Sequence, residues 1–394
     1  MLRPPLEVAD VIRAAGHFFV DRSRDWFSWR HLKVLNAILA CRTAALGGHV
    51  DECSRCGYRA ISFNSCRNRH CPKCQANARN HWLAARRLDL LPTQYVHVVF
   101  TLPQELAPLA LQNKRELYAL LFRASAETLL AVGRDPRHLG AELGFFSVLH
   151  TWNQQLLHHP HVHCVVPAGG LAADHTRWIS ARPNFFLPVK VLSRVFRGKF
   201  VAGLRQLYRD GKLSFAGTLA PLRTPKAFAT MLRSLFRSDW VVYCKRPFGG
   251  AEHVLHYLGA YTHRIAISNH RLVALAEGVV TFRWRDSAHK NKKRLARLQV
   301  DEFLRRFFLH VLPRGFVRIR YFGFFAHRRR AALLPICFQL LAAAAVASAA
   351  VRNGTSAPPL WKCPQCQAAM IVVERLSPRE ARLRSPPGKA APCS

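Results

Sequence analysis

Residues 158–166, with the sequence HHPHVHCVV, constrain the fold of this chain more than any other segment. The run has the pattern of a strand, in which side chains two residues apart lie on the same face. His161 and His163 therefore point to one side, while Val162 and Cys164 point to the other side and into packing. Two neutral imidazoles side by side can bind a divalent cation, and a strand holds them rigidly. We therefore predict a strand that carries two ligands of a metal site.

A cation on this strand needs a third protein ligand, and an amide oxygen is suitable for Mg²⁺ or Mn²⁺. Gln154 lies seven residues before His161, at the end of the preceding strand or in the connection that follows it. Asn153 and Gln155 are alternatives to Gln154. Core and surface histidines outnumber metal ligands in proteins, so the His-x-His pair indicates a metal site only together with other catalytic groups.

The chain carries a large excess of positive charge. Its 394 residues include 59 Lys and Arg against 22 Asp and Glu, which gives a formal net charge of +37. Such an excess is difficult to keep compact without a polyanion nearby, so we expect nucleic acid as the partner. An anionic membrane surface is the alternative.

The basic residues are concentrated in residues 282–330, which contain 15 Lys and Arg, 3 acidic residues and several aromatic rings. Proteins bind single-stranded nucleic acid through basic side chains that contact phosphates and aromatic rings that stack on bases. Most aromatic rings of a folded protein, however, belong to its core. We therefore expect DNA, chiefly single-stranded, to bind here. The residues predicted to contact it are Arg264, Lys290, Lys292, Lys293 and Arg294.

The twelve cysteines include two Cys-x-x-Cys pairs that are close together in the sequence. Cys53 and Cys56 form the first pair, and Cys71 and Cys74 form the second pair 15 residues later. Four thiolates in two such turns are typical of a tetrahedral structural zinc. A module this short has little core, so the metal would supply most of its folding energy. The spacing predicts a Zn²⁺ site within residues 49–80 and a reducing compartment.

Other potential ligands leave alternatives open. Cys66 and His70 lie between the two pairs, and either residue can replace one of the four ligands or serve a second site. Cys363 and Cys366 make a third Cys-x-x-Cys near the C-terminus. Two thiols alone do not define a metal centre, but they can complete a ligand set with distant residues.

Two tyrosines supply a candidate nucleophile. Tyr257 and Tyr261 lie four residues apart in a segment with the pattern of a helix, so they share a helix face. A phenolate can attack phosphorus and keep the 5′ phosphate as a covalent ester, which conserves the bond energy for later rejoining. A second tyrosine one turn away can make a second cut while the first is occupied. The alternative is a pair of core aromatic residues on an amphipathic helix.

Hydrophobic periodicity predicts an α+β protein with an antiparallel sheet, because strands alternate with helices along the chain. The expected strands are residues 95–102, 145–152, 158–166 and 240–245, with a hairpin at 273–285, and the expected helices are 104–132, 188–209, 251–263 and 300–312. We divide the chain into N-terminal helices at 1–48, a zinc-binding domain at 49–80, a catalytic domain at 90–330, and an Ala-rich helix with a mobile tail at 331–394.

The sequence also suggests a location. The chain opens without the apolar run of a signal peptide. The apolar residues 331–351 are rich in Ala and contain a proline, as in a buried helix rather than a membrane span. We therefore expect a cytoplasmic protein that associates with the nucleoid and does not contact a membrane.

Four segments together resemble the rolling-circle transposases of insertion sequences, the two-tyrosine branch of the His-hydrophobic-His (HUH) endonucleases. They are NSCRNRHCPKCQ at 64–75, VHVVFTLP at 96–103, HPHVHC at 159–164 and YLGAYTHRIAISN at 257–269. The resemblance covers nearly the whole chain and includes the N-terminal zinc-binding domain of such transposases. The sequence departs from the pattern at Ala260, where a basic or polar residue is expected, and does not clearly match after Arg329.

The resemblance implies a replication-initiator-like antiparallel sheet with the His-Val-His strand at its centre. It implies that His161 and His163 bind Mg²⁺ or Mn²⁺, and that Tyr257 and Tyr261 cut one DNA strand and rejoin it through a 5′-phosphotyrosine. The expected function is therefore rolling-circle DNA transposition. A plasmid replication initiator or relaxase of the same superfamily is an alternative, which the zinc module and the lack of a P-loop sequence disfavour. A catalytically inactive, zinc-containing DNA-binding protein is the other alternative.

Overall fold

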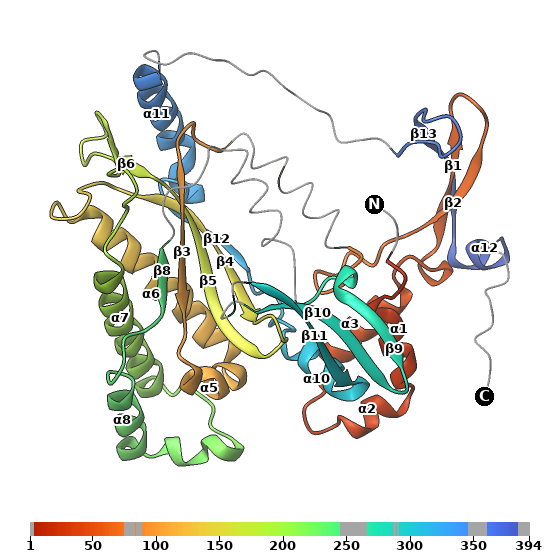
Figure 1. Ribbon diagram of the computed structural model, residues 1–394, viewed down its shortest axis with the longest axis horizontal. Coiled ribbons are helices and arrows are strands. Elements are labelled where there is room, and N and C mark those ends of the chain that lie inside the picture. Colours follow the sequence, from red (N-terminus) through yellow and green to blue (C-terminus); the bar gives the residue numbers. More distant parts are fainter. Residues whose placement is uncertain are drawn as a thin grey trace.

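The computed structural model describes residues 4–74, 83, 89–244, 266–286, 289, 291–345 and 361–384. Within these residues the chain combines helices with antiparallel sheets, so the predicted α+β class is confirmed (Figure 1). The described strands form a five-stranded sheet, two three-stranded sheets and a two-stranded pair.

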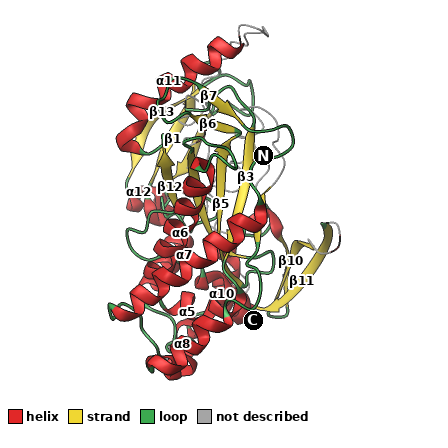
Figure 2. Ribbon diagram, turned by 90° about the vertical axis from the view of Figure 1, so that its left-hand side faces the viewer, coloured by secondary structure: helices red, strands yellow, loops and turns green. Residues whose placement is uncertain are grey.

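The five-stranded sheet positions the His-Val-His sequence. Its strand order is β12-β4-β5-β3-β8, so the strand with the histidines, β5, lies in the middle, as the resemblance implies. Val162, Cys164 and Val166 of β5 are fully buried in the core that α6 and α7 share with the sheet (Figure 2). The strands are β3 (Tyr95–Thr101), β4 (Gly144–Trp152), β5 (His158–Pro167), β8 (Val242–Cys244) and β12 (Ile319–Gly323).

One face of this sheet is covered by helices, namely α5 (Ala107–Gln112), α6 (Lys114–Arg134), α7 (Val189–Arg209) and α8 (Pro225–Ser234). The helix predicted at 104–132 is interrupted at Asn113, whose side chain donates to the carbonyl oxygens of Leu109 and Ser214. α7 approaches α6 closely at Gly203, where an added Cβ would lie 2.3 Å from Leu120 Cδ1. The Thr224 hydroxyl accepts from the N–H of Ala227, which gives α8 an N-terminal cap.

A second hydrophobic core joins the N-terminal helices to a three-stranded sheet of order β11-β10-β9. Glu277 and Gly278 have positive φ angles of 50° and 71°, as the predicted hairpin turn between β9 and β10 requires. β11 was not predicted as a strand because basic residues dominate its sequence, although its Ala296 and Leu298 pack against this core. The elements are α1 (Val8–Ala15), α2 (Phe18–Arg22), α3 (Trp29–Ala40), β9 (Leu272–Ala276), β10 (Val279–Asp286), β11 (Lys292–Gln299) and α10 (Val300–Leu309).

The other three-stranded sheet joins the two ends of the chain. β1 (Gly48–Cys53) lies between β2 (Arg59–Phe63) and β13 (Met370–Leu376), and α12 (Pro378–Leu383) follows β13. We expected a mobile tail in this C-terminal region, but β13 pairs with β1, as the orange and blue strands of Figure 1 show.

The Ala-rich region begins with α11 (His327–Ala345), whose Leu333, Leu334 and Cys337 are buried against Leu91 and Phe324. Among the described residues, no helix is both long and apolar enough to span a membrane. The remaining elements are the paired strands β6 (Gly169–Leu171) and β7 (Trp178–Ser180), and 3-10 helices at Ala44–Leu46, Gln104–Leu106, Gly217–Arg223 and Asn269–Arg271.

Candidate functional site

Strand pairing brings histidines from three strands to one face of the central sheet. Residues directly opposite each other in an antiparallel pair project to the same side. His161 on β5 lies opposite His150 on β4, and His163 lies opposite Val148 on β4. His97 on β3 pairs with Val165, two residues beyond His163, and therefore joins the same face. This face is the one turned away from α6 and α7.

Three of these histidines are close enough to share a metal ion. The potential ligand atoms of His150, His161 and His163 all lie within 4.8 Å of one another. The ring centroids of His150 and His163 are 4.2 Å apart, and those of His161 and His163 are 4.8 Å apart. The predicted pair is thus brought together, and a third imidazole comes from the neighbouring strand.

Hydrogen bonds orient the two rings of β5. The Nδ1 atom of His161 donates to the carbonyl oxygen of His159 at 2.7 Å. The Nδ1 atom of His163 lies 2.8 Å from Nε2 of His97. Because Nδ1 of each ring is engaged, Nε2 is the atom of each ring that would bind a metal, and such support is usual for histidine ligands.

Burial keeps these rings neutral. Desolvation lowers the pKa of His161 to about 4. It lowers the pKa of His163 well below its ordinary value, and the neighbouring His150 and His161 add to this effect. A neutral imidazole offers a lone pair to a cation, whereas an imidazolium does not. The rings of His161 and His163 are therefore in the form that can bind a metal.

The amides predicted as the third ligand lie instead in the turn between β4 and β5. The Asn153 side chain accepts from the backbone N–H groups of Gln155 and Leu157, which shapes this turn. The Gln154 side chain is exposed, and its backbone carbonyl accepts from Arg271. Arg306 donates to the carbonyl of Gln155 at 3.2 Å. The ring that joins His161 and His163 is that of His150, which the sequence reasoning missed.

Tyr257, Tyr261 and Arg264 lie outside the described residues. The chain is described on both sides of this segment, up to Cys244 and again from Ala266. On one side, Tyr243 of β8 is opposite Val99, the β3 residue that pairs with His163. On the other side, Ala266 belongs to the same buried cluster as Trp152, whose ring stacks on His150 at a centroid distance of 4.5 Å.

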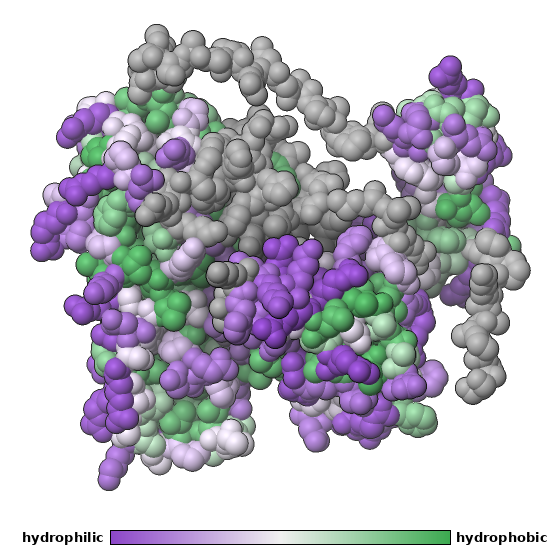
Figure 3. Space-filling model, in the orientation of Figure 1, coloured by the Kyte–Doolittle hydropathy of each residue, from purple (hydrophilic) through white to green (hydrophobic). Residues whose placement is uncertain are grey.

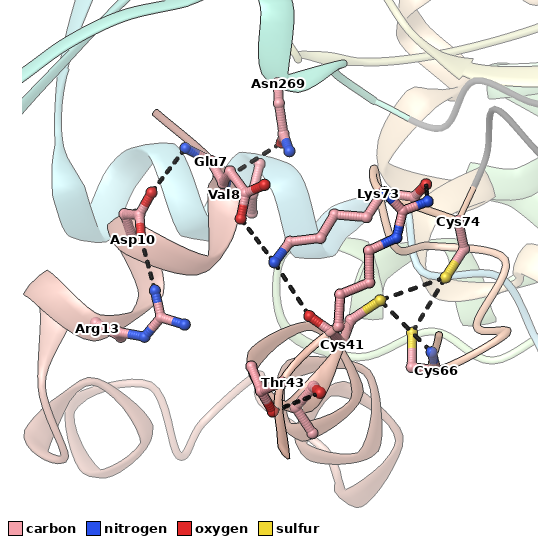
Figure 4. Close-up of polar contacts among 12 residues, drawn as sticks. Glu7, Val8, Asp10, Arg13, Cys41, Thr43, Cys66, Lys73, Cys74 and Asn269 are labelled. Carbon is pink, nitrogen blue, oxygen red and sulfur yellow. Dashed lines mark hydrogen bonds and ion pairs between the residues drawn. The ribbon is translucent and has the colours of Figure 1, made fainter. Parts of the chain in front are cut away.

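The four cysteines predicted as one zinc site are divided between two clusters. The sulfurs of Cys71 and Cys74 lie with those of Cys41 and Cys66 within 4.8 Å of one another. Cys74 Sγ is 3.5 Å from Cys41 Sγ and 3.6 Å from Cys66 Sγ (Figure 4). A tetrahedral zinc with bonds of about 2.3 Å separates its sulfurs by about 3.8 Å, so this donor set fits Zn²⁺. Cys41, just after α3, was missed because it belongs to no Cys-x-x-Cys pair.

Of the two alternative ligands, Cys66 joins this cluster and His70 does not. His70 is buried, and its Nε2 accepts from the backbone N–H of Leu312 at 3.1 Å while its Nδ1 contacts Asn68. Burial lowers the pKa of His70 to about 3, with a further contribution from Arg69. His70 is therefore a neutral structural residue that joins the cysteine loop to the chain after α10.

A buried ion pair supports the same cluster. Lys73 Nζ lies 2.6 Å from Glu7, which precedes α1, and donates to the carbonyl oxygen of Cys41 at 3.1 Å (Figure 4). Both charged side chains are less than a tenth exposed, so each charge needs the opposite charge beside it to offset the cost of its desolvation. Lys73 thus links the residue before α1 to the chain just after α3.

Cys53 and Cys56 face the C-terminal pair instead. Cys53 Sγ is 3.4 Å from Cys366 Sγ, and Cys56 Sγ is 3.6 Å from Cys363 Sγ. The division has a simple cause, because Cys53 ends β1 and β13 pairs with β1. The spacing of Cys-x-x-Cys identifies each turn but does not determine which turns meet.

Three of the residues predicted to contact DNA lie on the edge strand β11. Lys292, Lys293 and Arg294 are exposed, and Arg294 forms an ion pair of 2.9 Å with Asp286 on β10. Hydrophilic side chains gather at the end of the β10–β11 hairpin in Figure 3. Lys290 lies outside the described residues.

Comparison with known proteins identifies the family. A model described as "Transposase zinc-binding domain" matches residues 12–102, and a model described as "Putative transposase" matches residues 144–332. The chain is 50% identical over 388 residues to "Putative transposase y4qJ" of Sinorhizobium fredii, covering 95% of this chain and 96% of that protein. It is 28% identical over 320 residues to "Transposase for insertion sequence element IS801" of Pseudomonas savastanoi pv. phaseolicola, covering 79% and 74%. No solved structure matches the chain.

The fold and these matches define a DNA-processing enzyme with a zinc-binding module. The chain belongs to the insertion-sequence transposases that carry an N-terminal transposase zinc-binding domain, and the predicted resemblance is confirmed. Its substrate is DNA.

Proposed function

We propose that this transposase cuts and rejoins a single DNA strand through a 5′-phosphotyrosine, as a rolling-circle HUH enzyme. The observation that carries the proposal is the cluster of His150, His161 and His163 on adjacent central strands. Its rings are close together, and those of His161 and His163 are neutral and supported by hydrogen bonds. These are the properties that a catalytic metal site requires.

The donor set suits a divalent transition metal. Imidazole nitrogens are softer ligands than the oxygens that Mg²⁺ prefers, so we expect Mn²⁺ to bind more tightly than Mg²⁺. A cation held there would polarise the scissile phosphate and stabilise the charge that develops on it. His161 and His163 hold it from β5, and His150 completes the protein ligands in place of the predicted Gln154.

Tyr257 and Tyr261 are the proposed nucleophiles. A phenolate oxygen attacks phosphorus, the bond from phosphorus to the 3′-side oxygen breaks, and that oxygen takes up a proton to become a 3′ hydroxyl. For rejoining, a 3′ hydroxyl loses its proton and attacks the phosphotyrosine, which releases the tyrosine. Each step exchanges one phosphoester for another, so no ATP is consumed.

The DNA strand requires a positively charged surface. The net charge of +37 provides strong attraction for phosphates. We propose that Lys292, Lys293 and Arg294 on β11 contact the strand, together with Arg264 and Lys290. A nucleoid-associated location follows from the same charge.

Covalent capture of DNA tests the proposal. The full chain is incubated with single-stranded DNA of the element end and Mn²⁺, and a covalent adduct is expected on a denaturing gel. Tyr257→Phe combined with Tyr261→Phe should abolish the adduct, because no phenol remains to attack phosphorus. Tyr208→Phe, on α7, is the matched control and should retain it. An undiminished adduct in the double variant would reject the assignment of the nucleophiles.

Binding measurements separate the metal from the affinity for DNA. His161→Ala or His163→Ala should abolish the adduct and leave strand binding within a few fold of the unaltered protein, because the basic surface supplies most of the affinity. Equal loss of binding and cleavage would indicate that these histidines maintain the fold rather than hold a catalytic ion.

A further inference from the structure

We propose that Cys53, Cys56, Cys363 and Cys366 bind a second structural Zn²⁺, which fastens the C-terminal segment 361–384 to the N-terminal zinc module. The four sulfurs lie within 4.8 Å of one another. The C-terminal pair lies outside both regions that match the family models, which are residues 12–102 and 144–332. This site shares no ligand with the cluster of Cys41, Cys66, Cys71 and Cys74.

The sulfur distances fit a metal and not a disulfide. Cys53 Sγ is 3.4 Å from Cys366 Sγ, and Cys56 Sγ is 3.6 Å from both Cys363 Sγ and Cys366 Sγ. A disulfide requires about 2.05 Å, whereas tetrahedral zinc holds its sulfurs about 3.8 Å apart. Four thiolates without an oxygen ligand favour Zn²⁺ over Mg²⁺ or Mn²⁺.

The two Cys-x-x-Cys turns have matching backbone geometry. In the first turn the N–H of Gly57 donates to the carbonyl of Cys53 at 3.2 Å, and in the second the N–H of Gln367 donates to that of Cys363 at 2.9 Å. The residue after each second cysteine has a positive φ, 69° at Gly57 and 62° at Gln367. Two turns of the same shape, from opposite ends of the chain, thus present their sulfurs to one point.

Further hydrogen bonds close both turns in the same manner. The N–H of Cys53 donates to the carbonyl of Tyr58, and the N–H of Cys363 donates to that of Ala368, each at 2.8 Å. In the first turn, the N–H groups of Arg55 and Cys56 also point to Cys53 Sγ at 3.4 and 3.5 Å. Such donors stabilise a thiolate, which is the form that binds zinc.

Besides its pairing with β1, the C-terminal segment has only small apolar clusters to hold it in place. Ile371, Val372 and Val373 of β13 are 53%, 55% and 45% exposed. The buried members of the cluster around the cysteines are Cys53, Cys363 and Met370. A module with so small an apolar interior usually depends on a metal for its folding energy. The ion would also close a loop of about 300 residues, since Cys56 and Cys363 are 307 positions apart.

Metal counting under non-denaturing conditions tests the proposal on the full chain. Native mass spectrometry of the reduced chain with His161→Ala and His163→Ala, which removes the histidine cluster as a metal site, should find two Zn²⁺ per chain. Adding Cys363→Ser and Cys366→Ser should lower this count to one, while adding Cys244→Ser, a cysteine of β8 outside both clusters, should retain two. A count of one in the chain with both histidines replaced, or of two after Cys363 and Cys366 are also replaced, would overturn the second site.

Thiol labelling gives a test that needs no substitution. Cys56 is exposed, so a free thiol there would react rapidly with a maleimide. In the zinc-loaded protein we expect slow labelling of Cys56 and Cys363, and at least about tenfold faster labelling after a chelator removes the metal. Rapid labelling of both in the zinc-loaded protein, or detection of a Cys53–Cys366 disulfide, would contradict the proposal.

Hydrogen exchange tests the structural consequence. The backbone amides of β13 that pair with β1 should be protected in the zinc-loaded protein and exchange much faster in the Cys363→Ser, Cys366→Ser variant. Amides of β5 should exchange equally slowly in both proteins. Unchanged protection of β13 in the variant would show that the metal does not hold this segment.

Discussion

Nε2 of His97 lies 2.8 Å from Nδ1 of His163, and the two rings are parallel within 3° with centroids 5.0 Å apart. If His163 uses Nε2 for a metal, its proton resides on Nδ1 and is donated to His97. His97 would then fix both the tautomer and the rotation of a metal ligand without touching the metal. Residues in such supporting positions commonly contribute one to two orders of magnitude to metal affinity.

We therefore predict that His97→Ala weakens metal binding, so that cleavage requires more Mn²⁺. The Mn²⁺ concentration needed for half-maximal adduct formation should rise about 10- to 100-fold, with a smaller rise for His97→Gln, which retains a hydrogen-bonding group. His138→Ala, in a surface turn, is the control. An unchanged Mn²⁺ requirement in His97→Ala would show that His97 does not position His163.

The third ligand can be assigned by comparing two variants. His150→Ala should lower the rate of adduct formation at least about 100-fold, because a lost ligand weakens an ion that contributes several kcal/mol. Gln154→Ala should stay within about threefold, since this side chain is exposed in the turn. The reverse order of effects would restore the amide as the ligand and exclude His150.

The basic strand should act on affinity and not on chemistry. Lys292→Ala with Lys293→Ala should weaken single-strand binding and reduce the slope of log affinity against log salt by about 1.4, the contribution of two phosphate contacts. Lys190→Ala with Lys226→Ala, on α7 and α8, removes the same charge elsewhere. If both pairs change the slope equally, β11 has no special part in DNA binding.

His310 should contribute to the acid sensitivity of the fold. Its Nε2 donates to the carbonyl of Leu156 at 3.0 Å, so its Nδ1 accepts from Thr151. Burial lowers the pKa of His310 from 6.5 to about 3. The unfolded chain therefore takes up a proton that the folded chain does not, and stability present above pH 6.5 is lost as the pH falls toward 3.

His310→Gln should make the stability less dependent on pH in that window, by at most about 1.4 kcal/mol per pH unit. Urea unfolding midpoints measured between pH 7 and pH 4 would show this difference. A steeper dependence in His310→Gln would show that the sign of the linkage is wrong.

Short-range patterns in the sequence were sufficient for much of the fold. The i, i+2 spacing places His161 and His163 on one face of β5, Glu277-Gly278 gives the hairpin, and Thr224 begins α8. Each of these depends on neighbouring residues, for which backbone geometry is restrictive. For the same reason the turns at Cys53 and Cys71 were recognisable.

Features that depend on distant pairing were not predictable from one sequence. His150 joins the histidine cluster because of the register between β4 and β5, which the sequence does not specify. The partners of Cys53 were missed because β13 comes from the other end of the chain. β11 was read as a basic run, since its strand conformation depends on pairing with β10 rather than on its own composition.

Arg271 and Arg306 both donate to carbonyl oxygens of the β4–β5 turn, at Gln154 and Gln155. Arg271 directly precedes β9, and Arg306 belongs to α10, which packs on the β9–β11 sheet. These two hydrogen bonds connect the turn of the hairpin that contains His150 and His161 to the sheet that contains the basic strand β11. A DNA strand that displaced this sheet would have to break both hydrogen bonds or move the two histidines together with the sheet.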